Sequence, residues 1–290
     1  MTKMEDLFDH CEALVREHDK DRFLATLFAP AVQRGPLFAL YAFDLEIAQI
    51  RDRAREPMPG EIRLQWWREV LSGERGGEAA AHPVAAALTE TIARFALPAE
   101  RLIALTDAHA FDLYDDPIET FAVLEAYLRR TAATILDLAA RICGGAPAEH
   151  AAERAGIACG ITALLRAFAL NASRRQLFVP VEFLERGTTP EAIFAGQSSP
   201  FLLNALGMLR TRARQHLQGL EAALPQVSAA VLPALLPAAL VPGYLALMEG
   251  ADYDPFHTAI EIPQWRRQWT LWRAARRYAR RVGRISPTAS

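Results

Sequence analysis

Hydrophobic residues recur along most of the chain at the three- and four-residue spacing of an amphipathic α-helix. Alanine, leucine, arginine and glutamate dominate these stretches, and the β-branched alternation that favours strands is nearly absent. Proline and glycine interrupt the pattern, for example at Pro30, Pro36 and Pro98 and over residues 73–77. The pattern predicts helices over residues 4–18, 20–28, 34–52, 60–72, 83–96, 98–114, 119–143, 147–172, 199–223, 227–248 and 262–283.

None of the connections between these helices is long enough to separate two domains, and no internal repeat is present. We therefore expect one all-α domain over residues 1–290, with an N-terminal helix within 1–19 and a short tail at 286–290. A bundle of this many antiparallel helices can enclose a central cavity. The chemistry of such a cavity depends on the polar side chains that face it.

Residues 222–248 contain no charged side chain and are long enough to cross a bilayer, which takes about 20 apolar residues. Pro225, Pro233, Pro237 and Pro242 interrupt the stretch, and each proline removes a backbone donor from a helix. We therefore expect buried, proline-broken helices in the core instead of a membrane span.

Composition excludes several classes of protein. The 290 residues are 51% hydrophobic and 23% charged, which is typical of a globular chain and not of a disordered one. The net charge of −2 does not suggest a nucleic-acid partner. Three scattered cysteines fit neither a disulfide scaffold nor a cysteine zinc site, and no signal peptide is apparent, so we expect a cytoplasmic location. The seven histidines lack metal-ligand spacing.

The last predicted helix carries tryptophans at Trp265, Trp269 and Trp272, on one side of the helix. Arginines that include Arg266 and Arg273 gather on the other side. In an ordinary amphipathic helix the tryptophans would enter the core and the arginines would face water. The alternative is a helix that binds an anionic membrane surface or a protein partner, because tryptophan suits the headgroup layer and arginine attracts anionic lipid.

Two segments carry a resemblance to a known family. Residues 27–34 (LFAPAVQR) with 37–43 (LFALYAF) resemble the entry to the first motif of squalene/phytoene synthases, and residues 156–180 resemble the region of their second motif. The resemblance covers roughly residues 20–280. It implies the isoprenoid-synthase fold, in which helices surround a deep pocket for prenyl chains. In these enzymes a pair of aspartates from each of two facing helices holds Mg²⁺, which stabilises the departing diphosphate.

The chain departs from this family pattern at the positions that matter for metal binding. Tyr41, Asp52 and Arg166 are retained. The positions that have lost the family's polar residue are Leu45, Ala48, Gly160, Ala163, Ala167 and Asn171. Four carboxylates are thereby reduced to one.

Other carboxylates do not restore the missing pairs. Asp44 is about 12 Å from Asp52 along a helix axis, and Glu46 points roughly opposite to Asp44. Asp112 and Asp116 have helical spacing, but they lie at a predicted helix end, where carboxylates are mostly solvated or cap the next helix.

The same departures resemble one branch of the family. The stretch from Glu46 to Asp52 (EIAQIRD), together with SRRQLFVP at residues 173–180, is similar to the squalene/phytoene-synthase-like assembly factor of respiratory complex I. This resemblance implies a role in the assembly of complex I near the membrane. Its partners would be complex I subunits or assembly proteins.

We therefore predict a non-catalytic protein, peripheral at the inner membrane, with no catalytic residue, no metal and no nucleic-acid partner. Tyr41, Asp52, Arg166 and Arg34 would line a pocket that is able to bind a prenyl or lipid chain, with Asp44 and Glu46 nearby. The alternative is a Mg²⁺-dependent head-to-head prenyltransferase that uses Asp52, Asp44 and Asp116. A terpene-binding carrier without turnover is a third hypothesis.

Overall fold

The computed structural model describes residues 2–54, 56–144, 148–184 and 188–282 as helices joined by turns, with no strand in these ranges. The all-α prediction is confirmed. The α-helices are α1 (Thr2–His18), α2 (Lys20–Thr26), α3 (Ala31–Ala48), α4 (Ile50–Arg53), α5 (Pro57–Leu71), α6 (Gly76–Ala81), α7 (Pro83–Phe95), α8 (Ala99–Ala108), α9 (Phe121–Leu128), α10 (Thr134–Ile142), α11 (Glu149–Arg166), α12 (Phe168–Ser173), α13 (Pro190–Phe194), α14 (Pro200–Ala223), α15 (Leu232–Leu235), α16 (Val241–Leu247) and α17 (Gln264–Ala279).

Shorter helical turns connect several of these helices. The 3₁₀ turns are η1 (His109–Leu113), η3 (Val181–Phe183), η4 (Leu224–Gln226), η5 (Ala229–Val231) and η6 (Leu236–Leu240), and η2 (Arg129–Ala133) is a π-helical turn. The predicted N-terminal helix is confirmed as α1. The predicted tail at 286–290 lies outside the described residues.

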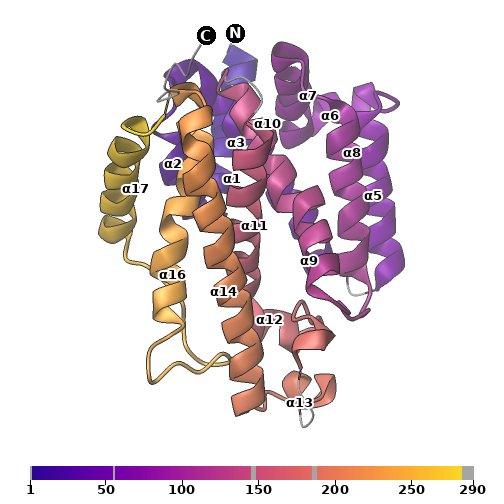
Figure 1. Cartoon of the computed structure of the whole chain (residues 1–290). Coiled ribbons are helices and arrows are strands. Elements are labelled where there is room, and N and C mark those ends of the chain that lie inside the picture. Colours follow the sequence, from indigo (N-terminus) through magenta and orange to yellow (C-terminus); the bar gives the residue numbers. More distant parts are fainter. Residues whose placement is uncertain (1, 55, 145–147, 185–187, 283–290) are drawn as a thin grey trace, which may run out of the picture.

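The helices form a bundle around α11, which runs through its centre beside α14 and α10 (Figure 1). α5 and α8 lie at one side of the bundle, and α17 lies at the opposite side (Figure 1). The middle of α3 is buried, including Phe38, Tyr41 and Phe43. Each such large side chain contributes about 1.5–3 kcal/mol when it is removed from water, so these residues fix α3 against α1 and α7.

Two glycines let α11 approach the helix that precedes it. A Cβ at Gly156 would lie 2.3 Å from the Cα atom of Ala133 in the π-helical turn, so no other residue fits there without a backbone shift. A Cβ at Gly160 would lie 2.6 Å from Cδ2 of Leu128. Gly160 therefore permits close contact between α11 and α9.

Several predicted boundaries are wrong. The helix expected over 34–52 divides into α3 and α4 at Gln49, and the helix expected over 147–172 divides into α11 and α12 at Ala167. α3 continues through Pro36, its sixth residue, where proline removes one backbone hydrogen bond without ending the helix. α6 forms where a break was expected, because Trp66 and Arg75 both donate hydrogen bonds to Glu78 in that helix.

The uncharged stretch behaves as predicted. The segment Ala229–Leu247 is long and apolar enough to be considered as a membrane span, but 72% of it is buried inside the bundle. It consists of the short segments η5, α15, η6 and α16, which are interrupted by proline. This segment therefore forms one wall of the core.

Candidate functional site

A cavity of about 360 Å³ lies between α2, α11, α16 and α17. Apolar side chains form one wall, and charged side chains gather around the rest. The lining residues are Glu17, His18, Asp19, Lys20, Asp21, Arg22, Asp44, Ala132, Ile135, Leu136, Cys159, Gly160, Thr162, Ala163, Arg166, Pro237, Val241, Tyr244, Glu261 and Arg267. This is the central cavity that the bundle was expected to enclose.

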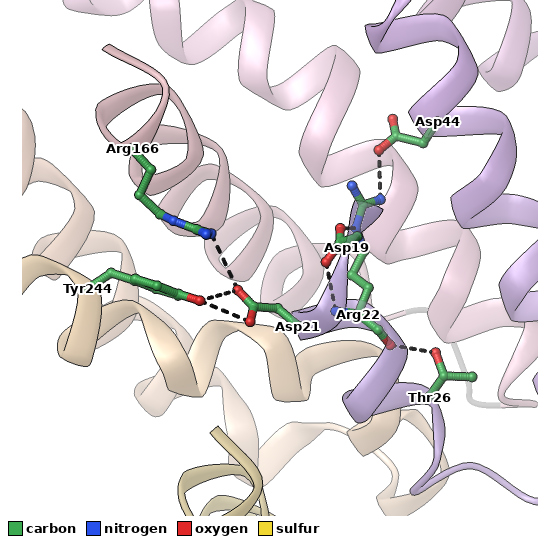
Figure 2. A network of polar contacts seen from close by, with 7 residues as sticks. All are labelled: Asp19, Asp21, Arg22, Thr26, Asp44, Arg166 and Tyr244. Atoms are coloured by element: carbon green, nitrogen blue, oxygen red, sulfur yellow. Dashed lines mark hydrogen bonds and ion pairs between the residues drawn. The ribbon is translucent and has the colours of Figure 1, made fainter. Parts of the chain in front are cut away.

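Asp21 is the focus of the polar contacts in this cavity (Figure 2). The Tyr244 hydroxyl lies 2.7 and 2.9 Å from its two carboxylate oxygens, and Arg166 Nη1 lies 3.4 Å from Oδ2. Arg267 Nε lies 3.2 Å from Oδ1. Burial raises the pKa of Asp21, although Tyr244 and the two arginines act in the opposite direction. The Tyr244 hydroxyl of α16 and guanidinium groups from α11 and α17 thus converge on one carboxylate of α2.

A second polar group surrounds Arg22 (Figure 2). Its Nη1 lies 2.6 Å from Oδ2 of Asp44, and its Nε donates to Asp19. Burial by itself lowers the pKa of Arg22, but Asp19 and Asp44 outweigh burial and raise it. The guanidinium lies 5.1 Å from the ring centroid of Tyr41, which is fully buried beneath it. The charge of Asp44 is therefore compensated within the protein.

These contacts decide whether the cavity fits Mg²⁺. Among the carboxylates that line it, Asp19, Asp21 and Asp44 are each paired with arginine side chains. Within the described ranges, no group of three or more histidine, cysteine, aspartate or glutamate side chains is arranged to hold a metal ion. Because Mg²⁺ needs carboxylate oxygens that are free to bind it, the residues present do not fit the ion.

The residues predicted to line the pocket separate into two groups. Arg166 and Asp44 line the cavity, and Tyr41 supports it from below. In contrast to the prediction, Asp52 and Arg34 are not among the lining residues. Asp52 pairs with Arg174. Arg34 donates to the carbonyl oxygens of Ala29 and Leu27, at 2.9 and 3.0 Å, and so holds the turn between α2 and α3.

The six positions that were expected to have lost the family's polar residues are also dispersed. Gly160 and Ala163 line the cavity. Leu45 is half-buried against the core, and Ala48 is exposed at the end of α3. Ala167 is half-buried at the break between α11 and α12, and Asn171 lies in α12. None of the last four residues lines the cavity.

Glu46 belongs to a different pocket. A space of about 220 Å³ is lined by Glu46, Ile50, Arg53, Arg63, Trp66, Trp67 and His82. Burial raises the pKa of Glu46 to about 7, while Arg53 acts in the opposite direction. Oε2 of Glu46 lies 3.6 Å from Nε2 of His82. Glu46 and Asp44 therefore point into separate pockets, as the helical spacing predicts.

Asp112 was expected to be solvated or to cap a helix, and this expectation is wrong. Its carboxylate lies 2.7 Å from Nδ1 of His109 and accepts a hydrogen bond from the Tyr127 hydroxyl at 2.9 Å. The histidine is buried, so the carboxylate supplies a charge partner inside the bundle. Asp116 is exposed and does not join this cluster.

α17 does not pack its tryptophan face against the core, as an ordinary amphipathic helix would. Its buried side consists of Arg267, Leu271, Ala274 and Tyr278. Trp265, Trp269 and Trp272 are 63%, 54% and 38% exposed. The interpretation that places the tryptophans in the core is therefore wrong.

Sequence reasoning missed Asp21, Arg22, Tyr244 and Arg267 as cavity residues. A signal for Arg267 was present, since it shares a helix face with Leu271, Ala274 and Tyr278. No such pattern marked Asp21 or Arg22, because α2 is a helix of only seven residues. The partners of Asp21 at the cavity, Arg166 and Tyr244, are more than a hundred residues away in the chain. The partner of Arg22, Asp44, lies on another helix.

Comparison with known proteins agrees with this fold. The chain is 27% identical to "NADH dehydrogenase (ubiquinone) complex I, assembly factor 6" of Rattus norvegicus, over 90% of this chain and 82% of that protein. It is 23% identical to the 15-cis-phytoene synthase of Synechococcus elongatus, over 93% of each chain. A crystal structure of a dehydrosqualene synthase in complex with ligand superposes with a TM-score of 0.83 at 19% identity, covering 96% of this chain and 98% of that one. The bundle therefore has the isoprenoid-synthase fold. The squalene/phytoene synthase family model matches residues 15–273, and the chain belongs to the squalene/phytoene synthase family.

Proposed function

We propose that this chain is a non-catalytic member of its family that acts in the assembly of respiratory complex I, at the cytoplasmic surface of the inner membrane. The relatives named complex I assembly factor 6 support the assembly role, because their identity to this chain exceeds that of the phytoene synthases compared with it. Its partners would be complex I subunits or other assembly proteins.

The observation that carries the non-catalytic part is the pairing of Asp21 and Asp44 with arginines. Loss of diphosphate from a prenyl substrate develops several negative charges in a site of low dielectric, and metal ions stabilise these charges. Here the arginine–carboxylate pairs are already compensated, and Ala48, Ala167 and Asn171 supply no carboxylate. Such a cavity supports binding without ionisation of the ligand.

We further propose that the cavity holds a prenyl or lipid chain. Ile135, Leu136, Pro237 and Val241 provide an apolar wall. Burial of apolar chain surface against this wall is favourable at about 25 cal/mol per Å². Extraction of the purified protein with organic solvent, followed by mass spectrometry, is expected to yield an isoprenoid or acyl lipid in proportion to protein. A protein purified free of any lipid would contradict this part of the proposal.

Prenyl transfer is the second candidate function. The similarity to a phytoene synthase along 93% of both chains favours it. In that case Asp52, Asp44 and Asp116 would hold Mg²⁺. Asp52 forms an ion pair with Arg174, and Asp44 forms one with Arg22. Asp116 is exposed and does not line the cavity.

One assay separates the two functions. The purified protein is incubated with Mg²⁺ and farnesyl or geranylgeranyl diphosphate, and released pyrophosphate is measured. We expect no release above that of the Asp52→Ala variant. Turnover that Asp52→Ala abolishes would overturn the non-catalytic proposal.

A second experiment tests the assembly role directly. Deletion of the gene from its host is expected to lower NADH:quinone activity in the membranes, and the wild-type chain is expected to restore it. Asp52→Ala, in which the only aspartate retained at the two motifs is removed, is expected to restore the activity equally well. Membranes with full complex I after deletion would contradict the assembly role.

A further inference from the structure

The solvent-facing side of α17 carries three large aromatic side chains, which are usually buried. Trp265, Trp269 and Trp272 lie on the side of the helix opposite to the buried residues Arg267, Leu271, Ala274 and Tyr278. The rings of Trp269 and Trp272 stack with their centroids 5.0 Å apart. Removing such large side chains from water is worth more than 1 kcal/mol each, so their exposure needs a physical reason.

Positive charge accompanies these tryptophans. α17 contains no acidic residue. Arg276 lies 3.9 Å from the ring centroid of Trp272, and Arg266 lies 5.1 Å from that of Trp265. Arg266, Arg273, Arg276 and Arg280 are exposed, and no described carboxylate lies within ion-pair distance of them. The outer face of α17 thus combines indole rings with uncompensated guanidinium groups.

Other arginines of this region have a different use. Arg277 and Arg281 lie 3.5 and 3.2 Å from the carboxylate of Glu221 in α14. Arg267 pairs with Asp21 at the cavity. These contacts fix α17 to the bundle, so that its tryptophan face is held outward on a rigid support.

We propose that the outer face of α17 docks on a bilayer surface that contains anionic phospholipid. Tryptophan rings favour the headgroup layer, and arginines beside them attract phosphate groups. The sixteen residues of α17 would extend about 24 Å along the membrane plane. The pattern fits a lipid surface, since the face combines indole rings, which suit the headgroup layer, with a single sign of charge that anionic headgroups match along its whole length.

The docked helix would also bring the cavity close to the bilayer. Arg267 reaches the cavity from the inner side of the same helix whose outer side carries the tryptophans. A lipid held in the cavity would therefore lie within a helix diameter, about 10 Å, of the membrane surface. The docking of α17 rests on the proposed function at the inner membrane, and it names the surface of the protein that contacts the bilayer.

Vesicle sedimentation with the full chain tests the proposal. The protein is mixed with vesicles of phosphatidylcholine alone or of phosphatidylcholine with phosphatidylglycerol. We expect retention only on the anionic vesicles and release as salt rises, because salt screens exposed charges. Arg266→Gln, Arg273→Gln and Arg276→Gln together are expected to lower the partition coefficient by about fivefold for each arginine removed. Trp265→Ala with Trp269→Ala is expected to lower it by about tenfold or more.

α5 offers a matched control on the other side of the bundle (Figure 1). Met58 and Ile62 are 74% and 65% exposed, and Arg63 is exposed beside them. The variant Met58→Ala, Ile62→Ala, Arg63→Gln removes similar groups and is expected to bind like the wild type. The arginine variant of α17 changes only exposed side chains, so circular dichroism and the melting temperature should remain unchanged.

Equal retention on neutral and anionic vesicles would overturn the proposal, as would an α17 arginine variant that binds like the wild type. The vesicles contain no complex I protein. The docking proposal can therefore fail while the assembly role stands, and a failed complementation of complex I leaves the vesicle result unaffected.

Discussion

Asp52 and Arg174 form an ion pair between two segments that are 122 residues apart in the chain. Asp52 lies in α4, just after α3, and Arg174 directly follows α12. The motif resemblance implies that Asp52 occupies one of the positions where the family has its metal-binding aspartates. In this chain it connects the two motif regions through an arginine instead of facing a second carboxylate.

This pair should contribute little to stability. The two side chains are 38% and 33% exposed, and exposed ion pairs are worth about 0–1 kcal/mol. Asp52→Asn is therefore expected to lower the free energy of unfolding by less than about 1 kcal/mol. Urea denaturation of Asp52→Asn, Arg174→Gln and the double variant measures the coupling between the two residues. A loss of several kcal/mol in either single variant would indicate a larger role for the pair.

Asp21→Asn should have a larger effect. Arg267 is 6% exposed, so loss of the carboxylate leaves a buried guanidinium without its charge partner. Asp21→Asn also relieves the burial of a charged carboxylate, but the unpaired Arg267 costs more, so we expect a decrease of roughly 1–3 kcal/mol in the free energy of unfolding. Inorganic pyrophosphate should restore part of this loss in Asp21→Asn, because an anion that binds only the folded protein stabilises it. The wild type, in which Asp21 already occupies the arginines, serves as the control. A pyrophosphate effect of equal size in the wild type would argue against this interpretation.

The raised pKa of Glu46 predicts that the stability of the protein depends on pH. Burial raises its pKa from an ordinary value of 4.5 to about 7. The folded protein therefore favours the protonated form, and the stability that protonation contributes is present below about pH 4.5 and is lost as the pH rises through 7. Glu46→Gln resembles the protonated form. We expect it to exceed the wild type in stability by roughly 2–3 kcal/mol at pH 8 and to match it near pH 4.5.

Urea denaturation of both proteins at the two pH values checks this prediction. Glu61→Gln, the same substitution at a partly exposed position on α5, is measured alongside as the control. The prediction fails if Glu46→Gln is less stable than the wild type at pH 8, since a charged Glu46 would then be stabilising.

The glycines of α11 give a prediction about packing. Gly156→Ala would place a Cβ against the backbone of Ala133, which cannot move without displacing the π-helical turn, and we expect a loss of about 3 kcal/mol. Gly160→Ala meets the end of the Leu128 side chain at 2.6 Å and the Cβ of Ala132 at 3.2 Å, but no backbone atom within that range. Because the Leu128 side chain can shift and alanine favours the helix by about 1 kcal/mol, the loss should be well below that of Gly156→Ala. Thermal unfolding of the two variants compares them directly, and equal losses would contradict the argument.

Much of the fold followed from local patterns. The periodicity predicted most of the helices, and proline correctly marked 222–248 as broken core segments instead of a span. The motif residues indicated the family. Errors arose where a helix boundary depended on tertiary contacts, as in α6, whose Glu78 is held by Trp66 and Arg75.

The candidate site was less accessible to sequence reasoning. Arg166 and Asp44 were expected at the cavity and line it, whereas Asp52 and Arg34 make contacts elsewhere. Asp21 was missed because its three partners come from α11, α16 and α17, which no local spacing connects to α2.

The sequence by itself determined the helical class, the family and the absence of carboxylates at Ala48, Ala167 and Asn171, since these depend on residue type and on spacing within a helix. Only the tertiary structure decided that arginines bind Asp21 and Asp44, and that the tryptophans of α17 face outward. A helix with two distinct faces can be packed by either one, and the choice depends on which neighbour supplies a partner. For α17 that partner is Asp21, which draws Arg267 inward and leaves Trp265, Trp269 and Trp272 at the surface.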